Sequence, residues 1–291
     1  MNPFAHLEDS LSASKIGTYL RCPLRFYFDR IERLPWERLP GALVIGSAVD
    51  RAVKDAVLRM KQGDEKPAAT DLGATFENFL KLELENPRAP IVWGSRLDED
   101  GARALGRSLM EALRPVLFTE ERLRRITATD VAFTVPLLDE RGAPMIDTPL
   151  IGVFDLVEET DRGPVPLEVK TASNRTQYLP DNLSRDVQAL VYGLAAQTLS
   201  GSGEARVKYV SAVKLKNPEV IESENTVTAE QLAWVRGVVV GVKRAIDSGV
   251  FVARPSTIEC GGCPFQGVCA KSGGSVKVAP KRLFALGETR R

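Results

Sequence analysis

The feature that most constrains this chain is a pair of apolar runs, rich in β-branched residues, on either side of a turn-forming cluster. Residues 150–155 form the first run and residues 166–171 the second, and a Thr-Asp-Arg-Gly-Pro segment lies between them. This pattern predicts an antiparallel β-hairpin. Because side chains alternate along a strand, Glu168 and Lys170 share one face of the second strand. The first strand delivers Asp155 close to the same place.

Two carboxylates and a lysine that meet on a sheet can do specific chemistry. Carboxylate oxygens are the ligands that Mg²⁺ prefers, together with waters and substrate phosphates. A lysine beside them, here Lys170 next to Glu168, can activate a water or stabilise charge on a phosphate that is being transferred. Taken alone this short motif is weak, because an ordinary exposed hairpin with a surface ion pair has the same sequence.

Length and composition indicate a soluble globular protein. The chain has 291 residues, enough for one large domain or two, of which 44% are hydrophobic and 26% charged. No apolar run is long enough to span a bilayer, and the first residues lack the features of a secretory signal, so we expect a cytoplasmic location. The net charge of +1 gives no global sign of nucleic-acid binding.

Basic and aromatic residues are interleaved near the N-terminus. Six lysines and arginines between residues 15 and 38, Arg21 and Arg25 among them, alternate with five aromatic residues. This mixture suits a surface that holds phosphates and stacks bases. An amphipathic helix that packs its aromatic residues into the core would show the same pattern. Cys22 and Pro23 interrupt that helix or begin its second half.

The four cysteines of the chain indicate a metal site. Cys260, Cys263 and Cys269 form a C-x₂-C-x₅-C pattern in a glycine-rich loop, and the fourth thiolate must come from Cys22. In a reducing compartment such a set more often binds metal than forms disulfides. Ligation by four cysteines fits either zinc or an iron–sulfur cluster. Either one would join the two ends of the chain and close a very long loop.

The remaining pattern predicts a mixed α/β core. Residues 41–60 form a helix with a broad apolar face, and Asp50 lies beside that face. Gln188 and Tyr192 are four residues apart on the helix expected after the hairpin, and therefore share a helical face. The order of strands and helices after residue 124 predicts a mixed sheet flanked by helices. We expect strands at about 124–138, 148–158, 165–171 and 206–215, and helices at 187–200 and 229–245.

These pieces together resemble the PD-(D/E)xK nucleases of the RecB/AddB type. They are most similar to the iron–sulfur subgroup, which includes CRISPR-associated RecB-like exonucleases and phage proteins. The resemblance covers residues 10–55 and 148–270. It is carried by four groups of residues and by an opening similar to the family's N-terminal motif: Phe154-Asp155, Glu168-Val169-Lys170, Gln188 with Tyr192, the split cysteine set, and Leu11-Ser12 through Tyr19 to Cys22-Pro23.

The resemblance implies a restriction-endonuclease-like fold and a metal-dependent DNA nuclease. For the activity, the resemblance implies first of all that the protein is an exonuclease, which acts on DNA ends or single strands in recombination, repair or phage DNA processing. The implied sites are Mg²⁺ or Mn²⁺ at Asp50, Asp155, Glu168 and the Val169 carbonyl; catalysis by Asp155, Glu168, Lys170, Gln188 and Tyr192; a [4Fe–4S] cluster at Cys22, Cys260, Cys263 and Cys269; and DNA contacts from Arg21, Arg25, Thr171 and Tyr192.

The resemblance, together with the sequence pattern of the segments it does not cover, suggests how the chain is organised. The cluster would act as a clip between its N-terminal and C-terminal parts. We expect N-terminal helices at 1–60, a helical insert at 61–122 that could form a wall or lid over the site, a nuclease core at 123–250, a cysteine loop at 251–272 and a flexible basic tail at 273–291.

The chain departs from the family at two positions. Asp50 stands where the family usually has a histidine, but an aspartate can supply an oxygen to Mg²⁺ or Mn²⁺ at least as readily as an imidazole. Phe154 replaces the proline of the motif, which matters little because only the carboxylate of Asp155 does chemistry.

Other functions fit parts of the same pattern. A structure-specific endonuclease could use the same core, with residues 60–120 to read its substrate. A non-catalytic DNA-binding accessory protein for recombination, or a zinc-based binding module, would need no active site. The chain carries no phosphate-binding helicase motif, so any unwinding would come from a helicase partner.

Overall fold

The computed structural model describes residues 10–63, 69–94, 97–201 and 204–276. Within these residues the chain forms two compact units, each assembled from segments that are separated in the sequence. Unit 1 takes residues 10–38, 134–152 and 229–276, and unit 2 takes residues 39–133 and 153–228. None of the described helices is long and apolar enough to cross a membrane.

Unit 2 is built on a mixed β-sheet, as the sequence predicts. Its strands follow the order β5-β6-β7-β8, and β4 pairs with β5. The expected hairpin is confirmed, since β5 and β6 pair antiparallel; β6 and β7 are parallel, and β7 and β8 antiparallel. The strands are β4 (Ile126–Val135), β5 (Leu150–Glu158), β6 (Val165–Ala172), β7 (Ala205–Val213) and β8 (Glu219–Val227). The last residues of β4 and the first residues of β5 belong to unit 1.

Helices cover both faces of this sheet. Glu168 of β6 accepts a hydrogen bond from α8 (Val187–Ser200), whereas Thr171 of β6 lies against Gly46 of α3 (Gly41–Lys61). Residues three apart on a strand point to opposite faces, so α8 and α3 lie on opposite sides of β6. The predicted mixed sheet between helices is therefore present.

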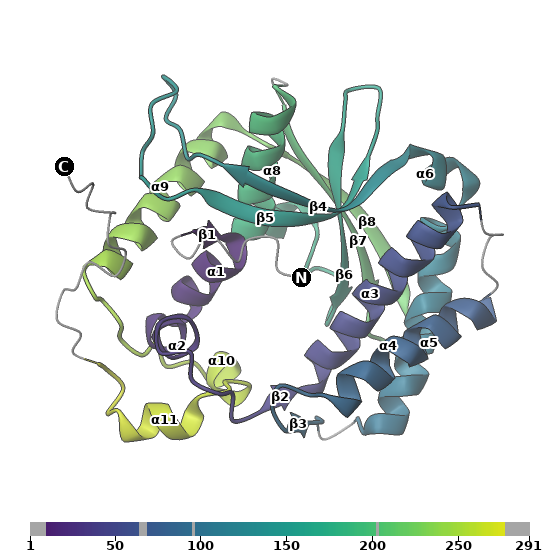
Figure 1. The fold of residues 1–291 in the computed structure, drawn as a ribbon, viewed down its shortest axis with the longest axis horizontal. Helices are drawn as coiled ribbons and strands as arrows, with labels where there is room; N and C mark the ends of the chain where they lie inside the picture. Colours follow the sequence, from purple (N-terminus) through teal and green to yellow (C-terminus); the bar gives the residue numbers. More distant parts are fainter. Residues whose placement is uncertain (1–9, 64–68, 95–96, 202–203, 277–291) are drawn as a thin grey trace, which may run out of the picture. The chain divides into compact units, whose positions relative to one another are not determined.

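Local sequence signals explain where the main helices begin and end. The side chain of Asp186 caps α8 by accepting from the backbone of Ala189, and α8 ends at Gly201, whose φ of +64° suits glycine. Asp98 caps α5 in the same way. The α3, α4 and α5 helices pack side by side (Figure 1). Unit 2 also contains α4 (Ala69–Glu85), α5 (Glu99–Leu117), α6 (Glu120–Arg125), α7 (Pro180–Leu183), β2 (Leu39–Pro40) and β3 (Ile91–Val92).

Unit 1 brings the first and last described segments of the chain together. Leu24 donates its backbone N–H to the carbonyl of Val252, and the Tyr19 hydroxyl donates to the carbonyl of Val250. Leu11 pairs in parallel with Leu150 at the start of β5. The elements are β1 (Leu11–Ser12), α1 (Ala13–Arg21), α2 (Pro23–Phe26), a π-helical turn (Tyr27–Ile31), α9 (Ala229–Asp247), α10 (Thr257–Gly261) and α11 (Gln266–Lys271).

Some predictions at this level are wrong. The cysteine segment is not a simple glycine-rich loop, because Ser256 caps the short helix α10 and a second short helix, α11, follows. Strand β8 was not predicted, since its polar residues do not form an apolar run. Residues 120–125 are helical because Thr119 caps them, although we expected a strand from about 124. Most of the predicted tail, residues 277–291, lies outside the described residues.

Candidate active site

The hairpin brings Asp155, Glu168 and Lys170 together. The Lys170 ammonium lies 2.7 Å from Glu168 Oε2 and 3.1 Å from Asp155 Oδ2. Backbone groups fix the two carboxylates further. Asp155 N donates to Glu168 Oε1 at 3.2 Å, and Val169 N donates to Asp155 Oδ2 at 3.2 Å. Glu168 is fully buried and Asp155 nearly so, so this trio lies within the fold and is not an exposed surface pair.

Helix α3 adds Asp50 and a residue that the sequence interpretation missed, Lys54. The Lys54 ammonium lies 3.0 Å from Asp50 Oδ2 and 2.9 Å from Asp155 Oδ1. It also lies 2.9 Å from Asp130 Oδ1, a second residue that was not predicted. Lys54 is one helical turn after Asp50, a spacing that could have drawn attention to it. Asp130 belongs to a strand, β4, whose sequence carries no motif.

Gln188 and Tyr192 reach the same centre from α8. Gln188 Nε2 donates to Glu168 Oε2 at 3.2 Å. The Tyr192 hydroxyl donates to the carbonyl of Val153 at 3.0 Å, and its ring packs edge-on against Phe133 and Phe154. The helix spacing therefore places both side chains at the site, with Gln188 bonded to Glu168 and Tyr192 to the strand that carries Asp155.

The ionisable groups have strongly perturbed pKa values. Burial raises the pKa of Glu168 to about 8, assisted by the charge of Asp155 and opposed by Lys170. Burial and then the charge of Asp155 also raise the pKa of Asp50. Burial acts to raise the pKa of Asp155 as well, but Lys170 and Lys54 outweigh it and hold that pKa below its usual range. Such opposed shifts within one buried group are typical of functional sites.

Two buried hydroxyls border the carboxylates on the neighbouring strand. Tyr209 pairs with Glu168, and Ser211 pairs with Lys170, in the register between β7 and β6. Paired residues point to the same face of a sheet. Neither the Tyr209 hydroxyl nor the Ser211 hydroxyl has a hydrogen-bond partner within the described residues. Buried hydroxyls in this position are suited to hold water or substrate at the site.

Comparison with known proteins indicates a family for this chain. The PD-(D/E)XK nuclease superfamily matches residues 10–270. The chain belongs to this superfamily. A solved structure of a candidate exonuclease from Eubacterium rectale shares 13% sequence identity, with a TM-score of 0.56, 99% of this chain covered and 97% of the other. Another, of the protein SSO0001, has 13% identity and a TM-score of 0.41, with 91% and 87% covered. The comparison with curated proteins gives no match.

The superfamily's acidic residues would hold a divalent cation here, and their chemistry fits one. Asp50, Asp155 and Glu168 are carboxylates in a partly or fully buried site, where uncompensated negative charge is costly. Among the described residues, no three acidic, histidine or cysteine side chains are arranged as a complete metal-binding group. At this site Lys54 and Lys170 lie between the carboxylates, so a cation would share these oxygens with the two lysines.

The predicted cysteine ligands all belong to unit 1. Cys22, Cys263 and Cys269 pack against one apolar cluster made of Leu24, Phe28 and Phe265, whereas Cys260 is exposed. Burial raises the pKa of the Cys269 thiol, and so do the three other thiols through their charge. Among the described residues these thiols do not form a complete metal-binding group, so their binding of a cluster stays a prediction.

The remaining predicted DNA contacts have other neighbours in this structure. Arg21 and Arg25 lie 3.9 Å and 4.0 Å from the same oxygen of Glu259, and the Arg25 guanidinium lies over the ring of Trp36. Thr171 lies against Gly46 in unit 2. Their contact with DNA stays a prediction.

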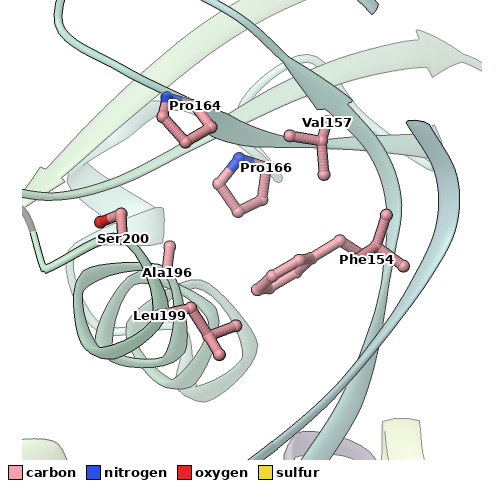
Figure 2. Close-up of a pocket in the computed structure, with 8 residues that line it drawn as sticks. Phe154, Val157, Pro164, Pro166, Ala196, Leu199 and Ser200 are labelled. Carbon is pink, nitrogen blue, oxygen red and sulfur yellow. The ribbon is translucent and has the colours of Figure 1, made fainter. Parts of the chain in front are cut away.

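An apolar pocket of unit 2 is separate in character from the active site. Figure 2 shows Phe154 and Val157 of β5 and Pro166 of β6 across from Ala196 and Leu199 of α8. The described residues that line it carry no ionisable side chain. The pocket therefore lacks the groups needed for metal binding or acid–base chemistry.

Proposed function

We propose that this member of the PD-(D/E)XK superfamily is a metal-dependent DNA nuclease, and specifically an exonuclease of the RecB/AddB-like iron–sulfur subgroup. It would act on DNA ends or single strands in recombination, repair or phage DNA processing, alone or with a helicase partner. The observation that carries the proposal is the buried group of Asp155, Glu168 and Lys170, with the lysine bonded to both carboxylates. The solved structure of a candidate exonuclease supports the proposal because its fold is similar to that of this chain.

The chain's own residues suit hydrolysis of a phosphodiester bond. Asp50, Asp155 and Glu168, with the carbonyl of Val169, would hold one or two Mg²⁺ or Mn²⁺. Such an ion supplies Lewis-acid stabilisation of the phosphate and lowers the pKa of water. Lys170 is positioned by both carboxylates, so its ammonium can orient the attacking water and stabilise negative charge as the bond breaks.

Gln188 and Tyr192 would act as positioning residues. Gln188 donates to Glu168, which in turn holds Lys170. Tyr192 holds the backbone of β5 two residues before Asp155. Groups that fix the orientation of catalytic side chains in this way raise the rate because less reorganisation is needed during the reaction.

In unit 1, we propose that Cys22, Cys260, Cys263 and Cys269 hold a structural [4Fe–4S] cluster. Three of these cysteines share one apolar cluster, which would keep solvent from the sulfurs. Cys22 is far in the sequence from the other three cysteines. The cluster would stabilise unit 1 by joining the N-terminal helices to α10 and α11.

The activity is tested with one single-stranded DNA in two forms, a closed circle and the same DNA linearised. Full-length protein is purified without oxygen and assayed with Mg²⁺ or Mn²⁺. An exonuclease degrades the linear form and leaves the circle intact, and labels at the 5′ or 3′ end report the polarity. Cleavage of the circle would show an endonuclease instead. Binding without cleavage of either form would favour the accessory role.

A further inference from the structure

Lys54 is a second positive charge inside the carboxylate group. Its side chain is only 13% exposed and lies within 3.0 Å of three carboxylates, those of Asp50, Asp130 and Asp155. Asp155 divides its two oxygens between the lysines, with Oδ1 facing Lys54 and Oδ2 facing Lys170. The carboxylate that the superfamily uses for metal binding is therefore flanked by an ammonium on each side.

The backbone at Asp130 is held in an unusual conformation where it meets Lys54. Its φ of +50° lies in the left-handed region, although the residue is inside strand β4. Strain of this kind persists when the surroundings compensate for it, and it clusters at functional sites. The ion pair with Lys54 is such a compensation. Both features indicate that Lys54 is anchored at this place.

The formal charges indicate how many divalent ions the site can take. A bound cation favours the ionised form of Glu168. With every carboxylate ionised, four carboxylates and two ammonium groups leave a charge of minus two, which a single divalent ion neutralises; the groups are Asp50, Asp130, Asp155, Glu168, Lys54 and Lys170. A second ion would leave an excess of positive charge beside the buried carboxylates of Asp155 and Glu168, which is unfavourable. Without Lys54 the charge would be minus three, and a second ion would then be favoured.

We propose that Lys54 is a built-in cation that takes the place of a second divalent ion. The inference rests on the proposed function, because it concerns the cation site of the nuclease. A single Mg²⁺ or Mn²⁺ binds at Asp155 and Glu168, while the Lys54 ammonium balances the charge on the Asp50 side and keeps its proton throughout. Lys54 is a charge-balancing residue and does not touch the substrate.

The number of bound ions tests this directly. Full-length protein, purified without oxygen, is titrated with Mn²⁺, and free Mn²⁺ is measured by electron paramagnetic resonance. The Mn²⁺ that still binds to Asp155→Asn is subtracted as binding outside the site. This variant lacks the carboxylate that a first and a second ion would share. We expect one ion per chain for wild type, for Lys54→Arg and for the control Lys81→Met, which alters an exposed lysine on α4. Lys54→Met should bind two.

Two ions in the wild type, or one ion in a folded Lys54→Met, would overturn the inference. If Lys54→Met does not fold, wild type and Lys54→Arg still decide, since two ions in either would be sufficient to reject it. DNA cleavage by the same samples separates this inference from the proposed function. If the wild type cleaves DNA with two bound ions, the proposed role of Lys54 is refuted but the nuclease activity is not. If the wild type binds one ion and cleaves no DNA, the nuclease activity is refuted and the role of Lys54 is supported.

Discussion

The metal-free protein should lose stability between about pH 5 and about pH 8 because of Glu168. Burial raises the pKa of this carboxyl from 4.5 to about 8. The unfolded chain releases the proton near the lower value, so within this window the folded state holds a proton that the unfolded state has lost. The stabilisation is therefore complete below the unfolded pKa and disappears as the pH rises through the folded pKa. Asp50, whose pKa is also raised, contributes in the same direction.

The size of the effect follows from the size of the pKa shift. Each pKa unit corresponds to about 1.4 kcal/mol, so Glu168 alone changes the free energy of unfolding by roughly 3 to 4 kcal/mol across this window. The side chain is fully buried, and solvent screening therefore does not reduce this value. For a chain of this length, the melting temperature should fall by about 6 °C.

Thermal unfolding in EDTA, followed by circular dichroism at a series of pH values under anaerobic conditions, measures this slope. Glu168→Gln should reduce this slope and leave only the contribution of Asp50. Glu158 offers a matched control, because it is also fully buried but its pKa is lowered. Burial acts to raise this pKa, but Lys208 and Arg122 outweigh the effect of burial. Glu158→Gln should keep the slope and be less stable at neutral pH. A wild type whose stability does not fall with pH, or a slope that is undiminished in Glu168→Gln, would refute the reasoning.

Three further substitutions probe other parts of the account. Asp155→Asn should lower cleavage by roughly 100-fold or more and destabilise the fold by about 3 kcal/mol, because Lys54 and Lys170 lose the carboxylate they share; a cleavage assay and urea unfolding measure the two effects. Tyr209→Phe should change the free energy of unfolding by less than about 1 kcal/mol in urea, because the hydroxyl it removes has no partner within the described residues. Cys260→Ser should lose visible absorbance and bound iron relative to wild type, and an unchanged spectrum would contradict the cluster.

The sequence was sufficient to predict the hairpin and the side chains that converge on it. Strand periodicity places Glu168 and Lys170 on one face, and strand pairing brings Asp155 to them, so local rules are enough. The helix from 187 to 200 was predicted with its observed bounds. A capping aspartate before it and a glycine after it account for those bounds.

The rest of the site depends on tertiary packing that no local pattern encodes. Lys54 belongs to the site because of how α3 lies against the sheet, and its spacing of one helical turn from Asp50 is by itself only a weak sign of this. Asp130 reaches Lys54 through a backbone conformation that a strand pattern does not predict. Tyr209 was passed over because an aromatic residue in an apolar strand usually packs in the core.

The most direct test of the central claim is the degradation of end-labelled DNA by anaerobically purified wild type and Lys170→Ala, with Mg²⁺ or Mn²⁺ and with EDTA. Lys216→Ala alters an exposed lysine and is the matched control. We expect metal-dependent cleavage by wild type and the control, and no cleavage by Lys170→Ala or in EDTA. Undiminished cleavage by Lys170→Ala, or wild type that binds every substrate and leaves it intact, would contradict the assignment of this site.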